Sequence, residues 1–183
     1  MTTPVSWSVG LVRAAVLLSV LLVPAHPVVA EVLDSTASGF TVQTTVQIAA
    51  PAAAVYDALT GAVDKWWDEA HTWSGRAANL TIDPRPGGCF CETLAGGGVQ
   101  HMMVIRADRG KMLRMIGGLG PLQSMAVAGV MTFTFTESGG RTTLQATYAV
   151  LAYTKEDLTV LAPLVDRVTA GQVARLKAFI ERP

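Results

Sequence analysis

Both cysteines of the chain, a glutamate and one of its three histidines lie close together in the stretch GGCFCETLAGGGVQH, from Gly87 to His101. Residues of these types can hold a metal ion, form a disulfide, exchange protons as a carboxylate–imidazole pair, or line a binding pocket. The apolar segments on either side of the glycines are typical of a β-hairpin. Because side chains alternate across a strand, the pairing of the two strands decides which of these residues can meet.

A hairpin count divides the side chains of this stretch between two faces. We take residues 95–98 as a four-residue loop and count back along both strands. One face then carries, in opposing pairs, Leu94 and Val99, Glu92 and His101, Phe90 and Met103. The other face carries Cys89 and Val104, Cys91 and Met102, Thr93 and Gln100. Because the first set is the more apolar apart from one polar pair, we predict that it lines an interior cavity in which Glu92 and His101 meet.

This register argues against a covalent or metal-binding role for the cysteines. Residues two apart on an ideal strand have Cα atoms roughly 6.5 to 7 Å apart, at the upper edge of relaxed disulfide geometry. A zinc site would need Cys89, Cys91 and His101 to converge from opposite faces, and C-x-C alone lacks the paired spacings of structural zinc sites. We therefore predict two partly buried free thiols on the outer face, and no metal.

The pair formed by Glu92 and His101 has two interpretations that the sequence leaves open. A buried carboxylate facing an imidazole acquires perturbed pKa values, and such a pair can act as general acid and base or can orient a ligand carbonyl. The same pair can instead be a satisfied polar contact that only fixes the strand register. Glu92 and His101 are therefore the candidate catalytic residues, without a cofactor.

Further candidate ligand contacts come from two stretches outside the hairpin. WWDEAHTWSG places tryptophans beside a histidine, and an indole offers a flat ligand a large apolar face. GGLGPLQSMAVAG lacks the spacing and strand-to-helix context of a dinucleotide or phosphate loop, so we interpret it as an apolar gate that includes Leu122. The predicted ligand-binding residues are Trp67, His71, Trp73, Phe90, Glu92, His101, Met103 and Leu122.

The elements that must position these residues follow from periodicity and turn residues. Alternating apolar residues and glycine-rich separators predict strands at 40–48, 79–83, 88–94, 99–107, 111–116, 129–137 and 142–151. The short connections favour antiparallel neighbours. Two short helices are expected after the first strand, one following Pro51 and ending at Gly61, the other in VDKWWDEAHTW.

The C-terminal segment predicts a long amphipathic helix. Its apolar stripe, with Gly171 as its weak point, consists of Leu161, Leu164, Val165, Val168, Leu176, Phe179 and Ile180. A single sheet cannot bury its apolar face alone, so this helix is expected to lie across the concave side of the sheet. The predicted fold class is α+β, with a curved antiparallel sheet of about six or seven strands around the helix.

Composition and the N-terminus limit the partners and the location. The chain has 183 residues and is 50% apolar, which fits one domain. Its formal net charge is zero, so it lacks the excess of positive charge that would attract a nucleic acid or an anionic membrane. Arg13, the apolar run at 14–23 and the small residues before Glu31 predict a signal peptide at 1–30, followed by an extension at 31–39 and the main domain at 40–183. The run is shorter than the roughly 20 residues of a spanning helix, so after cleavage we expect a periplasmic or secreted protein without stable membrane insertion.

The order of elements, with IAAPAAAVYDALT after the first strand, WW, GGCFCE and a closing helix that ends in RLKAFIE, resembles the START-like superfamily, also called SRPBCC. Within it, the chain is similar to the polyketide-cyclase-like and chaperone-ATPase-activator-like branches. The resemblance covers residues 40–182 and implies a helix-grip fold with a hydrophobic cavity between sheet and helix. Proteins of this kind mostly bind lipids or aromatic and polyketide ligands, and a minority are enzymes.

Three functions are then compatible with the sequence. The first is an exported protein that binds a hydrophobic or aromatic small molecule, which requires only the cavity. The second is a cofactor-independent cyclase, dehydratase or hydrolase-like enzyme that uses Glu92 and His101. The third is a chaperone-activating interaction module, which the resemblance suggests and which export would separate from a cytosolic partner.

Overall fold

The computed structural model describes residues 27–182. Its fold is α+β, and the element order begins with two strands, two helices and a third strand: β1 (Val29–Thr36), β2 (Gly39–Ile48), α1 (Ala52–Gly61), α2 (Val63–Trp66) and β3 (Leu80–Ile82). The chain continues with β4 (Cys89–Leu94), β5 (Gly97–Asp108), β6 (Met112–Gly117), β7 (Val127–Ser138), β8 (Arg141–Ala152) and α3 (Ala162–Ile180). Short 3₁₀ turns lie at η1 (Glu69–His71), η2 (Ala77–Asn79), η3 (Gly120–Ser124) and η4 (Leu158–Val160).

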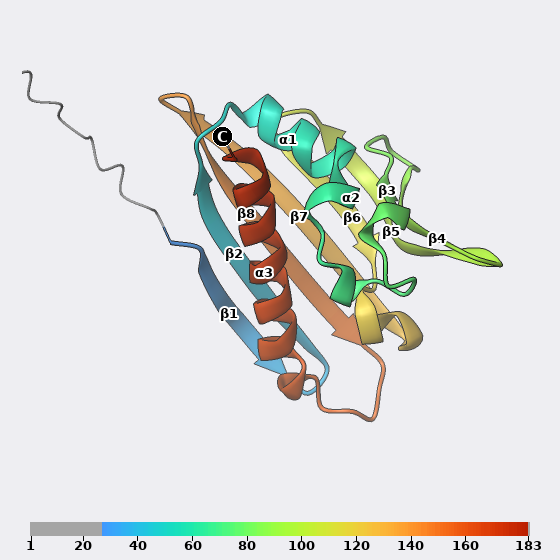
Figure 1. Ribbon diagram of the computed structural model, residues 1–183. Coiled ribbons are helices and arrows are strands. Elements are labelled where there is room, and N and C mark those ends of the chain that lie inside the picture. The colour runs from blue at the N-terminus through green and yellow to red at the C-terminus, as the bar shows by residue number, and fades with distance from the viewer. Residues whose placement is uncertain (1–26, 183) are drawn as a thin grey trace, which may run out of the picture.

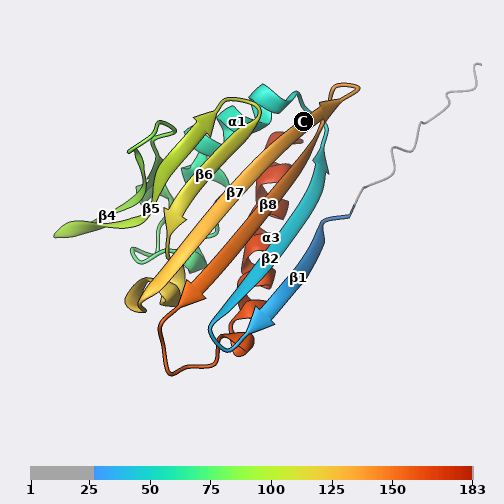
Figure 2. The same ribbon diagram turned by 180° about the vertical axis from the view of Figure 1, so that it is seen from behind.

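One curved antiparallel sheet holds all eight of these strands, in the order β1-β2-β8-β7-β6-β5-β4-β3. The long helix α3 lies along the concave side, over β1 and β2, while α1 and α2 cover the same side toward β3 (Figure 1). Seen from behind, the convex side carries no helix (Figure 2). This is the helix-grip arrangement that the sequence predicted.

The core lies between the concave face and α3, as the alternating patterns require. Along β2, Phe40, Val42, Thr44, Val46 and Ile48 are buried, and the residues that alternate with them are only partly buried. The facing residues of β8 repeat the pattern, because antiparallel partners share a face. On α3, Val173 and Leu176 close the core from the helix side.

The expected strands and helices are present, with differences at the N-terminal edge. The segment predicted as an extension at 31–39 contributes most of β1, an edge strand that pairs with β2, so the sheet has eight strands rather than six or seven. Every residue of β1 is exposed, and that is why no buried face appears in its sequence. The predicted signal peptide at 1–30 falls mainly on residues 1–26, outside the described residues. Within residues 27–182, no helix is long and apolar enough to cross a membrane.

Candidate functional site

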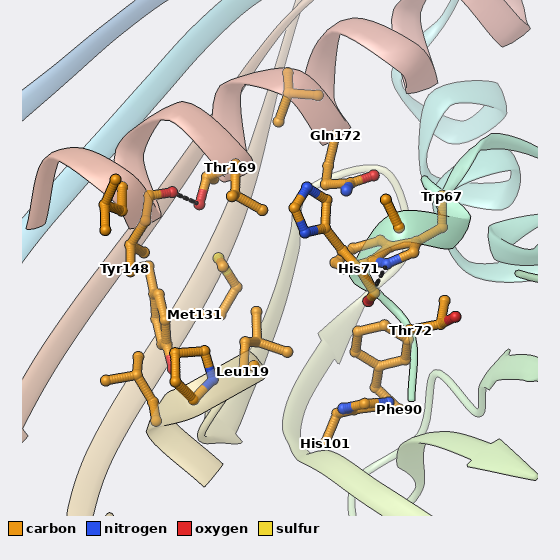
Figure 3. Close-up of a pocket in the computed structure, with 18 of the residues that line it drawn as sticks. Trp67, His71, Thr72, Phe90, His101, Leu119, Met131, Tyr148, Thr169 and Gln172 are labelled. Atoms are coloured by element: carbon orange, nitrogen blue, oxygen red, sulfur yellow. Dashed lines mark hydrogen bonds between the residues drawn. The ribbon is translucent and has the colours of Figure 1, made fainter. Parts of the chain in front are cut away.

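A cavity of about 480 Å³ lies between α3 and the concave face of the sheet. Its wall combines residues of α2 and the loop after it, β4, β5, β7, β8, the segment before and within η3, and α3. Figure 3 shows Trp67, His71 and Gln172 on one side of it and Tyr148, Met131 and Leu119 on another, with Phe90 and His101 at the β4–β5 end. Its volume falls in the range of small-molecule sites.

Most of the predicted ligand contacts line this cavity. The structure brings together Trp67, His71, Trp73, Phe90, His101 and Leu122. Glu92 does not line the cavity but lies behind His101, and Met103 does not line it either. Instead, Met103 borders a second, shallower depression of about 240 Å³ that shares His101 and Leu122 with the main cavity.

The position of Met103 follows from a register that differs from the predicted one. The β4–β5 loop is tighter than expected, so that Leu94 pairs with Gly97 and Glu92 with Val99. The pairing then shifts by one residue: Cys91 pairs with Gln100, but Phe90 pairs with Met102. This β-bulge leaves His101 as the extra residue of β5.

The bulge reverses the face of the next β5 residues, Met102 to Val104, and a second register shift between Val104 and Arg106 restores the original alternation. A one-residue slip moves a side chain to the other side of the sheet, so Met102 faces inward with Phe90, and Met103 lies outside beside Cys89. The predicted pairings of Glu92 with His101 and of Phe90 with Met103 are therefore wrong. The predicted side-chain contact between Glu92 and His101 is nevertheless present, because the bulge turns the extra histidine inward.

The prediction of two free thiols is also wrong: Cys89 and Cys91 form a disulfide. Their Cα atoms are 5.4 Å apart, which is shorter than the spacing of an ideal strand and inside the range that a disulfide spans. The shortening occurs at the step where β4 and β5 lose register. An even strand spacing was the assumption that made the bridge look unfavourable.

Glu92 is held by two backbone donors of one loop besides the histidine. Its side chain is 0% exposed and accepts the backbone amides of Trp73, at 3.0 Å, and of Ser74. His101 Nε2 lies 3.0 Å from Oε2 of the same carboxylate. Burial acts to raise the pKa of Glu92, but the hydrogen bonds from Ser74, Trp73 and His101 outweigh it and hold that pKa below its usual value.

Burial favours the neutral form of His101 beside this carboxylate. Burial lowers the pKa of His101, and the opposing attraction of Glu92 does not restore it. Since an ionised carboxylate only accepts hydrogen bonds, the single ring proton resides on Nε2 and is donated to Glu92. Nδ1 then carries a lone pair, and it is buried without a hydrogen-bond partner among the described residues. The pair therefore has the composition of a general base with its orienting carboxylate.

The loop after α2 forms the mouth of the cavity. Trp67 donates from its indole nitrogen to the carbonyl of His71 at 3.1 Å, and its ring packs edge-on against Phe90 with centroids 5.2 Å apart. Trp73 remains 56% exposed although it lines the cavity. Half-exposed aromatic side chains at an opening offer apolar surface to an entering ligand.

The sequence analysis missed four polar residues of the wall, Thr72, Tyr148, Thr169 and Gln172, and two of these form hydrogen bonds to other elements. Gln172 of α3 accepts the backbone amide of Asp68 through Oε1 at 2.9 Å and so ties the helix to the mouth loop. Tyr148 of β8 donates to the carbonyl of Gly117 at 3.1 Å, and burial raises its pKa despite a smaller opposing effect of the Leu119 backbone. Both lie inside apolar stretches, where a single polar residue carries no spacing signal of its own.

The segment predicted as an apolar gate covers one end of the cavity. Leu122 of η3 is fully buried and, with Leu119 and Pro121, faces the interior. The side-chain amide of Gln123 donates to the backbone carbonyl of Gln100 at 3.1 Å and attaches this segment to β5. Leu122 therefore lies in the cavity wall, and its contact with a ligand stays a prediction.

The donor set does not favour a metal centre. In residues 27–182 no three histidine, cysteine, aspartate or glutamate side chains are grouped closely enough to hold an ion. The two sulfur atoms that a zinc site would have used are bonded to each other.

Comparisons with known proteins agree with this architecture. A family model described as "Polyketide cyclase / dehydrase and lipid transport" matches residues 39–181. A putative uncharacterized protein from Rhizobium leguminosarum is similar in structure, with a TM-score of 0.60, 21% identity, and coverage of 86% of this chain and 100% of that one. Protein MLL2253 from Mesorhizobium loti has a TM-score of 0.56 at 19% identity over 78% of this chain and 97% of its own.

A further similar structure comes from a biosynthetic pathway. The di-domain ARO/CYC StfQ of the steffimycin biosynthetic pathway has a TM-score of 0.53 and 16% identity, and the match covers 79% of this chain and 51% of StfQ. At such identities the structures show a shared fold, and a shared fold does not by itself carry an activity. No curated protein matches the chain.

Proposed function

Because the chain belongs to the family of polyketide cyclases, dehydrases and lipid-transport proteins matched over residues 39–181, we propose that it binds a hydrophobic or aromatic small molecule in the cavity beneath α3. The observation that carries this proposal is the composition of the cavity wall: none of its residues is a lysine, arginine, aspartate or glutamate. A ligand that leaves water for such a wall gains about 25 cal/mol for each Å² of apolar surface it buries.

A neutral fluorescent probe tests this proposal. N-phenyl-1-naphthylamine is expected to bind with enhanced emission, while tryptophan emission is quenched because Trp66, Trp67 and Trp73 line the cavity. Val168→Phe fills the cavity from α3 and should weaken binding by about tenfold or more. The matched control is Ala178→Phe, which adds the same ring to an exposed position of the same helix. Equal binding by both variants would place the probe elsewhere and refute the proposal.

The Glu92–His101 pair favours catalysis as a second candidate function. The specific observation is a neutral, buried imidazole in the cavity wall whose proton is held on the side of the carboxylate. Such an arrangement suits proton abstraction from a bound ligand without a cofactor. Native mass spectrometry of protein purified from its own host would identify a co-purifying ligand. With that ligand, His101→Gln should abolish turnover and retain binding if the protein is an enzyme; loss of binding alone would support the simple binder.

We also propose that the protein is exported. Support comes from Arg13, the apolar run at 14–23 and the small residues up to Ala30, and the Cys89–Cys91 disulfide suits an oxidising compartment. Cleavage after Ala30 would shorten β1 by its first two residues, Val29 and Ala30, at an exposed edge. N-terminal sequencing of protein recovered from the periplasm or the medium should give a start within a few residues of Glu31, and an intact Met1 there would contradict cleavage.

A further inference from the structure

The disulfide lies directly against the wall of the cavity. It joins Cys89 to Cys91, and the residue between them is Phe90. The ring of Phe90 points inward, with its centroid 5.0 Å from that of His101 and 5.2 Å from that of Trp67. Glu92, which holds His101, follows Cys91 immediately. The bridge therefore constrains the backbone that carries Phe90, which lines the cavity, and Glu92, which holds His101.

The bridge also coincides with the irregular step of the β4–β5 pairing. Phe90 and Cys91 are the β4 residues between which the register shifts, and His101 is the β5 residue left over. The bridged Cα atoms are 5.4 Å apart, against roughly 6.5 to 7 Å in an ideal strand. Opening the bridge allows β4 to lengthen at the step where β5 has one extra residue, His101. Because the bulge at this step holds His101 toward Glu92, a change in the bulge moves the histidine.

The loop closed by this bridge is too short to matter much for overall stability. The stabilisation from cross-linking a chain grows with the number of residues in the loop, and here the two cysteines are separated by 2 in sequence. Much of the core lies on β2, β7, β8 and α3, and none of these three strands pairs with β4, which carries the cysteines. The consequence of the bridge is local, at Phe90 and His101.

The cysteines are placed where a thiol reagent can reach them. Both residues are only partly buried, and they lie on the convex face, opposite to the buried side chains of Phe90 and Glu92. No helix covers that face (Figure 2). Attack on the bridge therefore does not require the cavity to open.

We propose that Cys89–Cys91 is a thiol-exchange site that controls the affinity of the cavity for its ligand, an inference that rests on the proposed binding function. A thiolate of a dithiol attacks one sulfur, the S–S bond breaks, and the other cysteine leaves as a thiolate that takes up a proton. The second thiol of the dithiol then displaces the first cysteine and closes a cyclic disulfide. Two electrons and two protons pass from the dithiol to the protein, which ends with two free thiols.

The test compares oxidised and reduced protein with the same neutral probe. Native oxidised protein should show no free thiol, and dithiothreitol without denaturant should release two. Reduction should raise the dissociation constant of N-phenyl-1-naphthylamine by about three- to tenfold through loss of preorganisation, with a nearly unchanged urea midpoint. The double variant Cys89→Ala/Cys91→Ala should bind like the reduced protein and should not respond to dithiothreitol, which controls for effects of the reagent elsewhere.

A readout without ligand separates this inference from the binding proposal. The ring resonances of His101, followed by NMR, should move on reduction because the bulge relaxes, and those of His71 on the other side of the cavity should move far less. If the probe binds neither form while His101 responds, the binding proposal fails, and the thiol-exchange site stands without its role in affinity. If the probe binds both forms equally and His101 does not respond, the inference is overturned. Two free thiols in untreated native protein would also overturn it.

Discussion

Nε2 of His101 lies 3.0 Å from Oε2 of Glu92, and the two side chains are 5% and 0% exposed. The same carboxylate accepts the backbone amides of Trp73 and Ser74. One buried anion thus joins β4, the bulge of β5 and the loop at the mouth of the cavity. Its charge is compensated by hydrogen bonds rather than by a cation, which makes this group sensitive to substitution and to pH.

Replacing the carboxylate by an amide should destabilise the fold. Glu92→Gln keeps one acceptor oxygen and turns its NH₂ group toward one of the two backbone amides, which then lacks a partner. The free energy of unfolding, measured by urea denaturation at pH 7, should fall by about 2 to 3 kcal/mol. Glu69→Gln is the control, since exposed Glu69 also accepts a backbone amide, that of Ala77, and should cost less than about 1 kcal/mol. Equal losses in the two variants would mean that the buried hydrogen bonds of Glu92 stabilise the fold no more than the one that exposed Glu69 accepts.

Stability should decline as the pH falls below the ordinary pKa of histidine. Burial holds the pKa of His101 below 6.5 in the folded protein. As the pH falls, this histidine is therefore protonated first in the unfolded chain, which lowers the free energy of the unfolded state relative to the folded state. The free energy of unfolding should be highest above pH 6.5 and fall below it, and the lowered pKa of Glu92 should add a second decline below 4.5.

His101→Gln should remove the first decline and keep the second. Leu176→Ala is a control because it loses stability from the core without removing a titrating group, so its profile should keep the wild-type shape at lower values. Urea midpoints at pH 7.5, 6 and 5 suffice for the comparison. A His101→Gln profile parallel to that of the wild type would assign the pH dependence to another group.

The cavity should discriminate against anionic ligands. Its wall contains no cationic side chain, and the ionised Glu92 lies behind His101. An unpaired carboxylate that leaves water loses its hydration without compensation. At pH 7, 2-naphthol should displace N-phenyl-1-naphthylamine at about a tenfold lower concentration than 2-naphthoate, which has a similar ring system. Tighter binding of the naphthoate would reveal a cationic contact that the wall does not show.

Substitution of two glycines by alanine should change the stability of the protein in opposite directions. Gly171 lies exposed inside α3, and an added Cβ has free space around it, so Gly171→Ala should stabilise the protein by about 0.5 to 1 kcal/mol through helix propensity. A Cβ at Gly129 would overlap the carbonyl oxygen of Gly117 and crowd the ring of Tyr148, so Gly129→Ala should destabilise it by about 1 to 3 kcal/mol. Thermal and urea denaturation measure both; a destabilised Gly171→Ala would point to a packing role for that glycine.

Local periodicity in the sequence determined the kinds and order of the elements from β2 onward and, except along β5, the face that each buries. The alternation of Phe40, Val42, Val46 and Ile48 is a property of one strand, and the stripe that contains Val165 and Leu176 is a property of one helix. Both depend on neighbours along the chain, so they could be read without knowledge of the rest. The same reasoning placed Phe90, His101 and the tryptophans beside one cavity.

Tertiary structure alone decided the register at His101, the disulfide and the polar residues of the opposite wall. A bulge changes the pairing by one residue at a small local cost, and whether it forms depends on the packing of Phe90 and Met102 against elements distant in sequence. The bridge follows from that local geometry, since an even strand holds Cys89 and Cys91 too far apart. Gln172 and Tyr148 reach the cavity because α3 and β8 lie on either side of it. The relative position of two elements that are distant in sequence produces no periodic pattern in either segment.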